Sequence, residues 1–417
     1  MQLQTILNRV EKYKSFVYGS SRFVEASGTL ELEVMIAARA NSRPICSGCR
    51  RKRPGYDRLP PRRFEFVPLW QIAVFFVYAV RRVNCPECGV RAEEIPWCQG
   101  KQTQTRTYQW LLAKWAQRLS WQETARAFRT SWQSVFRAVK HAVFWGVAHD
   151  VWRDVRTLGV DEIAWRKGHS YLTMVYQLDE DRKRLLWVGQ EREKKTLEKF
   201  FRCLGRKQSA EVDFVCSDMW GPYLDVIAER APEAVHVLDR FHIMRLLNKA
   251  IDEVRRTEAK QMERDGYEPI LKHSRWCLLK RKENRTKKQT VKLKELMQYN
   301  LKSVKAHLQR EDFQQFWEYQ NPTWAGKFLD DWCTRVMRTN LEPMKKTART
   351  LRAHRDLILN WFQAGGRLSS GTVEGFNNKA KLTMRKAYGF RSPETAEIAL
   401  YHTLSDLPEP EFTHEFW

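Results

Sequence analysis

The sequence predicts a multidomain α/β protein in which a mixed β-sheet is interrupted by a large helical insertion. Three observations support this prediction. The chain has 417 residues, which is too long for a single ordinary core. Strand-like and helix-like runs alternate between residues 155 and 243. Residues 244–362 are then predicted to be almost entirely helical and are strongly basic, and one more helix is expected at Ser370–Ser392.

The charge balance points to a polyanionic partner. Lys and Arg number 73 against 49 Asp and Glu, which gives a formal net charge of +24. An excess of this size favours nucleic acid over a membrane surface. The longest apolar run, Val67–Val80, is interrupted by Pro68 and Gln71 and is too short to span a bilayer. Because the N-terminus also lacks a signal-peptide pattern, we expect a cytoplasmic, nucleoid-associated protein without a membrane partner.

The first predicted domain, residues 1–100, is rich in strands. An amphipathic helix is expected at residues 2–14, and alternating apolar and polar residues predict a strand at Thr29–Arg39. Two C-x₂-C pairs follow, and in a chain expected inside the cell they are better explained as metal ligands than as disulfides. They predict one structural Zn²⁺ held by four thiolates. The ligands are Cys46, Cys49, Cys85 and Cys88.

Alternatives to this zinc site remain open. The four thiols could be free surface or core residues, and Cys98 is a possible substitute ligand. The remaining cysteines have no paired spacing and are interpreted as small core residues. They are Cys203, Cys216, Cys277 and Cys333.

Residues 101–150 predict a helix-turn-helix domain. Helical periodicity continues from Thr105 to Gly146, and Ser120 with Glu123 has the spacing of a capping box. A short turn at Thr130–Ser131 separates the last two helices. In such a domain the start of the second helix contacts base edges, although a plain helical hairpin would have the same pattern. The candidate DNA-reading residues are Gln133, Ser134 and Arg137.

The next segment has the element order of the RNase H fold. Strands are expected at Leu158–Trp165, Tyr171–Leu178 and Arg184–Gln190, and two further strands alternate with helices after them. This order predicts an RNase H-like catalytic core formed by residues 151–243 and 363–405, with residues 244–362 inserted into it and residues 406–417 as a C-terminal tail.

Carboxylates occur at the positions where this core would bring them together. Asp161 lies on the first, central strand, and Asp218 ends the fourth strand, which pairs beside the first in this fold. Glu162 is expected on the opposite face of its strand. Glu374, near the start of the last helix, supplies a third acid, with Asn377, Asn378 and Lys381 on the same helix face. Three such carboxylates suit two Mg²⁺ or Mn²⁺ ions, whereas each acid alone would more often be structural.

Several motifs together resemble one known family. "GVDE", "CSDMWGPY", "DRFH" and "SGTVEGFNNKAKLTMRKAYGFR" are similar to segments of bacterial insertion-sequence transposases of the L-three family, and the similarity covers nearly the whole chain. It implies an Asp-Asp-Glu transposase that binds terminal inverted repeats, cleaves DNA and transfers strands, with Asp161, Asp218 and Glu374 as metal ligands. It also implies a catalytic role for His242 in an acid-x-x-His motif that begins at Asp239, although a structural histidine would fit the same place.

Basic clusters in the insertion and the last helix are candidate contacts to DNA phosphates. The segment Lys280–Lys294 carries eight cations and one glutamate, and such a single-signed run would repel itself without a partner. Trp220, two residues after Asp218, is a candidate for stacking on an unpaired base, or is a core residue. The candidate phosphate contacts are Lys280, Arg281, Lys282, Arg285, Lys287, Lys288, Lys381, Arg385 and Arg391.

Two other functions share some of these features. A structure-specific DNA nuclease would use the same metal chemistry without strand transfer, and a non-enzymatic DNA-binding regulator would share the helix-turn-helix and the charge. Three buried carboxylates argue against a regulator. For a transposase, two DNA ends must be cut and joined, so we expect a homodimer or larger assembly on double-stranded end and target DNA.

Overall fold

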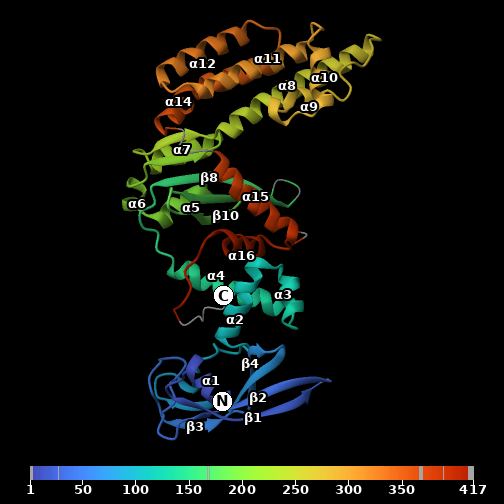
Figure 1. Cartoon of the computed structure of the whole chain (residues 1–417). Helices are drawn as coiled ribbons and strands as arrows, with labels where there is room; N and C mark the ends of the chain where they lie inside the picture. The colour runs from blue at the N-terminus through green and yellow to red at the C-terminus, as the bar shows by residue number, and fades with distance from the viewer. Residues whose placement is uncertain are drawn as a thin grey trace. The chain divides into compact units, whose positions relative to one another are not determined.

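The computed structural model describes residues 3–411 except 27, 167, 169, 366–369 and 388, and the side chains of 370–372 and 374 also lie outside the described part. The protein is a mixed α/β chain with several sheets and many helices, coloured along the chain in Figure 1. It consists of two compact units. The first combines Met1–Val151 with Glu394–Trp417, and the second is Trp152–Pro393.

The first unit begins with two small sheets. The larger has the strand order β1-β2-β5-β4, and Val34, Phe64, Phe76 and Trp97 belong to its buried core. The smaller has the order β3-β6-β7 and carries the cysteine pairs at its end. The predicted strand at Thr29–Arg39 is confirmed. The elements are α1 (Leu3–Val10), β1 (Phe16–Ala26), β2 (Thr29–Ala38), β3 (Gly55–Arg58), β4 (Arg62–Leu69), β5 (Ile72–Tyr78), β6 (Arg81–Cys85) and β7 (Gly89–Ala92).

Helices complete the first unit. The helical run predicted from Thr105 is confirmed, and Ser120 and Glu123 form both hydrogen bonds of the capping box that begins α3. The compact unit includes α16, and Lys140 of α4 pairs with Glu394 at 2.6 Å, whereas the predicted catalytic core extended to residue 405. The helices are α2 (Arg106–Arg118), α3 (Trp121–Ala127), α4 (Trp132–His149) and α16 (Pro393–Leu404).

The second unit contains a five-stranded mixed sheet with the order β10-β9-β8-β11-β12. β8 is central, and it pairs antiparallel with β9 and parallel with β11, as the sequence predicts. The three strands predicted at Leu158–Trp165, Tyr171–Leu178 and Arg184–Gln190 form within one residue of these bounds, and the two further strands that were expected also form. The elements are β8 (Thr157–Arg166), β9 (Ser170–Leu178), β10 (Lys183–Gln190), α5 (Lys194–Leu204), α6 (Arg206–Ala210), β11 (Phe214–Ser217), α7 (Gly221–Arg230), β12 (Val235–Leu238) and α15 (Ser370–Lys386).

Strand alternation gives β8 two different faces. Leu158 and Val160 point into the core that α5 and α7 cover. The opposite face begins at Gly159, where an added Cβ would lie 3.2 Å from the side chain of Val373 on α15. α15 therefore packs against β8 closely at Gly159, and residues of β8 with odd numbers face this helix.

A helical insertion separates β12 from α15, and Figure 1 shows its first helix, α8, as a long helix leaving the sheet. Ile243, Leu247, Ile251 and Val254 recur at helical spacing on α8 and form one side of the insertion core. The elements are α8 (Arg240–Arg264), α9 (Arg275–Leu279), η1 (Lys282–Asn284), α10 (Lys287–Leu296), α11 (Lys302–Gln314), η2 (Gln315–Glu318), α12 (Pro322–Met337), α13 (Glu342–Ala353) and α14 (Arg355–Gln363).

Candidate active site and cysteine cluster

Asp161 is a buried carboxylate on the central strand, with 7% of its surface exposed. One oxygen accepts a hydrogen bond from the backbone amide of Glu162 at 2.7 Å, and the other accepts one from the side-chain amide of Asn377. Burial raises the pKa of Asp161, and the nearby Asp218 raises it further, whereas His242 and the hydrogen bonds lower it. A charged carboxylate in so buried a position is costly unless a cation lies beside it, so the ionised form of Asp161 requires a cationic partner.

Asp218 lies beside Asp161 at the end of the neighbouring strand. Parallel pairing of Gly159 with Cys216 brings the two aspartates level, two residues further along each strand. The carboxylate of Asp218 accepts hydrogen bonds from Nη2 of Arg192 at 2.6 Å and from the backbone amide of Trp220 at 3.0 Å. Neighbouring strands are about 4.8 Å apart, so these two acids belong to one site.

Glu162 joins the same cluster from the other face of β8, which the sequence argument missed. Its Oε1 lies 3.2 Å from Nη1 of Arg192, the guanidinium that also binds Asp218. Its Oε2 is buried and has no hydrogen-bond partner among the residues that the structure describes. Burial, followed by the charges of Asp218 and Asp161, raises the pKa of Glu162 to about 7, against the opposing charges of Arg192 and Arg245. Glu162 does point to the opposite face of β8 from Asp161. It still joins the cluster because Asp218 follows the last residue of β11, and Arg192 contacts both Glu162 and Asp218.

Arg192 follows β10 and was not expected in the site. Its guanidinium lies over the ring of Trp220, with 4.7 Å from Cζ to the ring centroid. Trp220 also packs edge-on against Tyr223 at 4.6 Å. In this structure Trp220 therefore supports the arginine that spans Glu162 and Asp218. No sequence pattern pointed to Arg192, because it lies in a connection where hydrophobic periodicity gives no information.

The helix α15 reaches the site through Asn377. This side chain is 8% exposed and accepts a hydrogen bond from the hydroxyl of Tyr176 at 2.9 Å while donating to Asp161. The next residue back, Phe376, stacks on the ring of Tyr176. Position 374 belongs to α15 one turn before Asn377. The side chain of Glu374, the predicted third acid, lies outside the described residues.

His242 lies at the edge of the acidic cluster, in the first turn of α8. It lies near enough to Asp161 to lower the pKa of that carboxyl group, and its Nδ1 is buried without a hydrogen-bond partner in the described part of the chain. Asp239 Oδ2 is 4.0 Å from that nitrogen, which is too long for a hydrogen bond. Instead, the other oxygen of Asp239 accepts from the backbone amide of Phe241 at 2.8 Å. Asp239 therefore caps α8, and it fixes the helix end that carries His242.

The acidic cluster matches divalent-cation chemistry in its donor set. Carboxylate oxygens are the ligands of Mg²⁺ and Mn²⁺, and the unpartnered Oε2 of Glu162 shows that the cluster has spare acceptor capacity. Among the described side chains, however, these acids do not bring three ligand atoms within 4.8 Å of one another, as the cysteines do. A cation site at Asp161 and Asp218 therefore requires a further ligand or a movement of Arg192.

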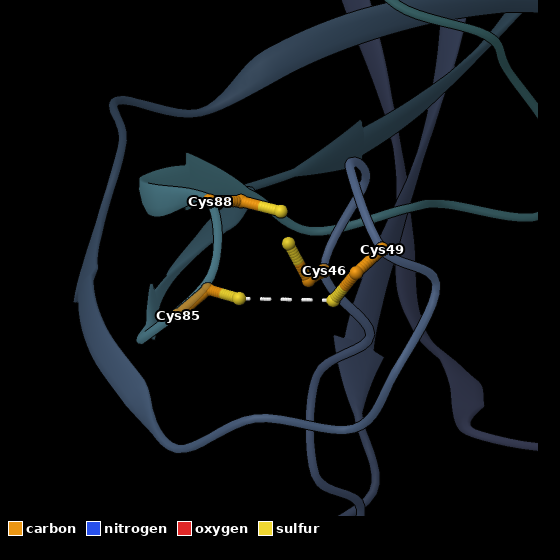
Figure 2. A group of neighbouring side chains, drawn as sticks. All are labelled: Cys46, Cys49, Cys85 and Cys88. Atoms are coloured by element: carbon orange, nitrogen blue, oxygen red, sulfur yellow. Dashed lines mark hydrogen bonds between the residues drawn. The ribbon is translucent and has the colours of Figure 1, made fainter.

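The four predicted cysteine ligands form one cluster. Their sulfur atoms all lie within 4.8 Å of one another, and Cys49 Sγ is 3.6 Å from Cys85 Sγ. Figure 2 shows the two pairs turning their sulfurs toward a common centre from separate loops. A tetrahedral Zn²⁺ with bonds of about 2.3 Å has ligand edges of roughly 3.8 Å. The sulfur spacing therefore fits a zinc site.

The backbone around the cysteines is built for this geometry. The residue after each pair adopts a left-handed conformation, Arg50 with φ of 57° and Gly89 with φ of 71°. An added Cβ at Gly48 would lie 2.9 Å from Cys88 Sγ, so glycine permits the close approach of the two loops. Burial opposes ionisation of Cys85, but backbone amides and neighbouring thiols lower its pKa to about 6, whereas burial and the neighbouring thiols raise the pKa of Cys88 to about 11. A thiolate is the form that binds zinc.

The other cysteines have separate surroundings. Cys98 is buried near Trp97 and donates to the carbonyl of Gln102 at 2.9 Å, so it is not among the clustered ligands. Cys216, Cys277 and Cys333 are buried, as expected of small core residues, whereas Cys203 is exposed.

The predicted DNA-reading residues occupy the start of α4. Gln133 and Arg137 are exposed, and Ser134 is half-buried with its amide bonded to the N-cap Ser131. Most predicted phosphate contacts are also on the surface, but Arg285 differs: its side chain is 7% exposed and donates to the carbonyl of Lys280 at 3.1 Å. Arg285 thus stabilises its own loop. The exposed candidates are Arg281, Lys282, Lys287, Lys288, Lys381, Arg385 and Arg391, with Lys280 half-buried.

The acidic cluster on a central strand and the excess of positive charge are features of a DNA-processing protein, and the sequence comparisons identify its class as a transposase. The family model of DDE transposases of the ISL3 type, described as a transposase, matches residues 158–400. This chain belongs to that family, the L-three family of insertion-sequence transposases, which implies DNA as a partner and the use of divalent metal.

Two curated relatives align along most of their lengths. The transposase for insertion sequence element IS1001 of Bordetella parapertussis is 29% identical over 353 residues, which cover 84% of this chain and 86% of the relative. The transposase for IS1557 of Mycobacterium tuberculosis (strain CDC 1551 / Oshkosh) is 30% identical over 381 residues, which cover 85% and 84%. Among the described residues, no helix has the length and apolar character needed to cross a membrane.

Proposed function

We propose that this transposase cleaves DNA at the ends of an insertion sequence and joins those ends to target DNA, using an RNase H-like core. The observation that carries the proposal is the level placement of Asp161 and Asp218 on neighbouring parallel strands, with α15 bonded to Asp161 through Asn377. The strand order, with β8 central and β11 beside it, supports the RNase H-like assignment.

Asp161, Asp218 and Glu374 are the proposed ligands of two Mg²⁺ or Mn²⁺ ions. The family implies divalent metal, and position 374 lies one turn from the residue that binds Asp161. Such ions, when bound, activate the attacking oxygen and stabilise the leaving oxygen of a phosphodiester. Glu374 would supply the further ligand that the described acids lack, and Arg192, if it releases Asp218, keeps Trp220 and Glu162 as partners.

His242 is proposed to contact the scissile strand or to move a proton at the reacting oxygen. It lies close enough to Asp161 for their charges to interact, and its buried Nδ1 has no partner among the described residues. A histidine with a spare ring nitrogen is suited to general acid–base chemistry or to a phosphate contact.

The first unit is proposed to recognise the element ends. The zinc site stabilises residues 1–100, and α3 and α4 act as a helix-turn-helix in which Gln133, Ser134 and Arg137 read bases. The exposed cations of the insertion and α15 hold phosphates. In this proposal the active form is a homodimer or larger assembly on double-stranded DNA.

A structure-specific nuclease is the second candidate function, because the same acidic cluster would support hydrolysis alone. The family membership favours the transposase. It also argues against a DNA-binding regulator without catalysis, as does the buried acidic cluster.

The test uses a labelled duplex that carries an element end, together with target plasmid and Mg²⁺ or Mn²⁺. Wild-type protein should cleave the end and produce joined products, whereas Asp161→Ala, Asp218→Ala and Glu374→Ala should each abolish both while end binding survives. Cleavage without joining would support the nuclease. Near wild-type cleavage by any one variant would remove that residue from the proposed ligands.

A further inference from the structure

A basic groove lies in the helical insertion between α8 and α9, outside the acidic site. It encloses about 550 Å³. Its walls carry five cations and one carboxylate: Arg245, Lys249, Arg255, Arg256, Arg275 and Asp252. None of these was among the residues that the sequence suggested for DNA contact. A concave surface with so strong an excess of positive charge favours an anionic ligand.

Asp252 arranges three of the arginines. Its carboxylate accepts two hydrogen bonds from Arg255, at 3.0 and 2.8 Å. Nε of Arg256 lies 3.7 Å from it, and Nε of Arg275 lies 3.4 Å from it. One carboxylate cannot neutralise three guanidinium groups, so it orients them and leaves most of their donors available. Arginine forks held in this way match phosphate oxygens.

The floor of the groove is fixed by a buried arginine. Nη1 of Arg310, a residue that is 1% exposed, donates to Asn248 Oδ1 at 3.0 Å and to the carbonyl of Leu279 at 2.6 Å. Asn248 belongs to α8 and Leu279 to α9, and both line the groove. The two helices are therefore tied together at the groove by hydrogen bonds to one buried side chain.

The groove continues a line of residues that begins at the acidic site. His242, Arg245, Lys249, Asp252 and Arg256 follow one another at intervals of three or four residues and so share one face of α8. His242 interacts electrostatically with Asp161, and Arg245 with Glu162. In the described part of the chain, neither Arg245 nor Lys249 forms an ion pair, and both are exposed.

The length of this line of residues can be compared with the spacing of phosphates along duplex DNA. The step from His242 to Arg256 covers about 21 Å at roughly 1.5 Å per residue. Duplex DNA places a phosphate on each strand about every 3.4 Å along its axis, so a duplex that runs parallel to α8 would have roughly six base pairs beside this line. Only one end of the line meets the acidic site.

We propose that the groove between α8 and α9 binds the phosphate backbone of DNA within about six base pairs of the phosphate held at Asp161 and Asp218. This inference rests on the proposed function for the position of the scissile phosphate. The contact is to phosphates rather than bases, because five of the eight residues that line the groove are cations, which match phosphate oxygens. It therefore strengthens binding on one side of the cut without reading sequence.

Binding experiments in EDTA test the groove without relying on cleavage. The groove variant is R245A/K249A, and the matched control is K302A/K305A, which removes two exposed cations of α11 that do not line the groove. Three labelled duplexes are compared: one extends ten base pairs on both sides of the cleavage position, and two stop three base pairs from it on one side or the other.

On the long duplex, R245A/K249A should bind about tenfold more weakly than wild type and lower the salt slope by about two, with little change in K302A/K305A. On one of the shortened duplexes, wild type and R245A/K249A should bind equally. Affinity within twofold of wild type on the long duplex, or the same loss on both shortened duplexes, would overturn the proposal.

Two further readings separate the possible failures. If the wild type neither cleaves nor joins ends while the loss still depends on duplex length, the proposed function fails and the groove stands. If the wild type is active and the groove variant binds normally, the groove alone fails. The last experiment is a titration with inorganic phosphate. If R245A/K249A abolishes tight phosphate binding but leaves DNA binding unchanged, the groove is a site for a small anion and the DNA contact is refuted.

Discussion

The side-chain amide of Asn377 donates a hydrogen bond to the carboxylate of Asp161, across 216 residues of sequence. Asn377 also accepts from the hydroxyl of Tyr176, so a single amide ties α15 to two adjacent strands of the sheet. The helix that carries Glu374 is therefore attached to the acidic site from both β8 and β9. This attachment makes the position of α15 depend on the buried surroundings of Asp161.

Replacing Asn377 with alanine should weaken both the fold and the chemistry. Tyr176 and Asp161 would each lose a partner in a buried place, which costs about 1–3 kcal/mol of unfolding free energy. Metal-dependent cleavage should fall strongly while end binding persists. Denaturant unfolding and a cleavage assay measure the two effects. The exposed neighbour Asn378 gives the control, Asn378→Ala, and equal behaviour of the two variants would contradict the role of the bond.

Zinc removal should destabilise the first unit. We expect one Zn²⁺ per chain, and C46S/C85S should lose it and lower the temperature of unfolding, because a structural zinc site contributes folding free energy directly. Elemental analysis and calorimetry provide the measurements. Cys203→Ser, at an exposed cysteine outside the cluster, should keep the metal. Undiminished zinc in C46S/C85S would exclude these ligands.

Arg137 should set sequence preference rather than general affinity. It is exposed on α4 near the start of the proposed recognition helix. Arg137→Ala should reduce the preference for the element end over random duplex by about 1–3 kcal/mol, the usual value of a good base contact. Competition binding measures this ratio. Arg126→Ala, on the exposed surface of α3, should instead weaken both duplexes alike, and a uniform loss for Arg137→Ala would indicate a phosphate contact.

The pKa of His402 predicts a loss of stability in acid. Burial lowers this pKa from 6.5 to about 4, while a hydrogen bond with the backbone of Ala113 acts in the opposite direction. The unfolded chain binds the proton first as pH falls, so stability is complete above pH 6.5 and is lost progressively toward pH 4. The loss is at most roughly 3 kcal/mol.

His402→Gln tests this dependence, because an amide does not titrate in this range. The variant should be less stable than wild type at pH 7.5, and the difference should shrink as pH falls toward 4. Thermal unfolding across that range is the measurement, and His149→Gln, at an exposed histidine of the same unit, is the control. A difference that stayed constant with pH would rule out His402 as a source of acid sensitivity.

Much of the sheet and part of the site could be predicted from sequence. β8 is recognisable as an apolar run that contains Asp161, and β11 as an apolar run that is followed directly by Asp218. The order of the strands alone then brings the two acids side by side. The place of Arg192 in the site could not be predicted, because it lies in the connection between β10 and α5, where the sequence has no periodicity. It also cannot be told apart from the many other arginines of the chain. The burial of Arg285 could not be predicted either. A run of charged residues gives no sequence signal for the one member whose side chain bonds to the backbone carbonyl of Lys280.

The active transposase should be an assembly of at least two chains on two DNA ends. The described part of each chain contains one acidic cluster of this kind, which would serve one scissile phosphate at a time, whereas movement of an element requires two ends to be cut and joined together. The exposed cations of α10 are far in sequence from both the cluster and the helix-turn-helix, so they are suited to holding a partner's DNA end. K287E/K288E should therefore weaken paired-end complexes and flatten their salt dependence, with sequence preference little changed.

K302E/K305E, with the same change in charge on α11, should retain pairing. Light scattering of the protein with end DNA and a gel assay for paired ends give the stoichiometry. A complex of one chain with one duplex that is fully active in strand transfer would refute the assembly, and normal pairing by K287E/K288E would exclude α10 from it.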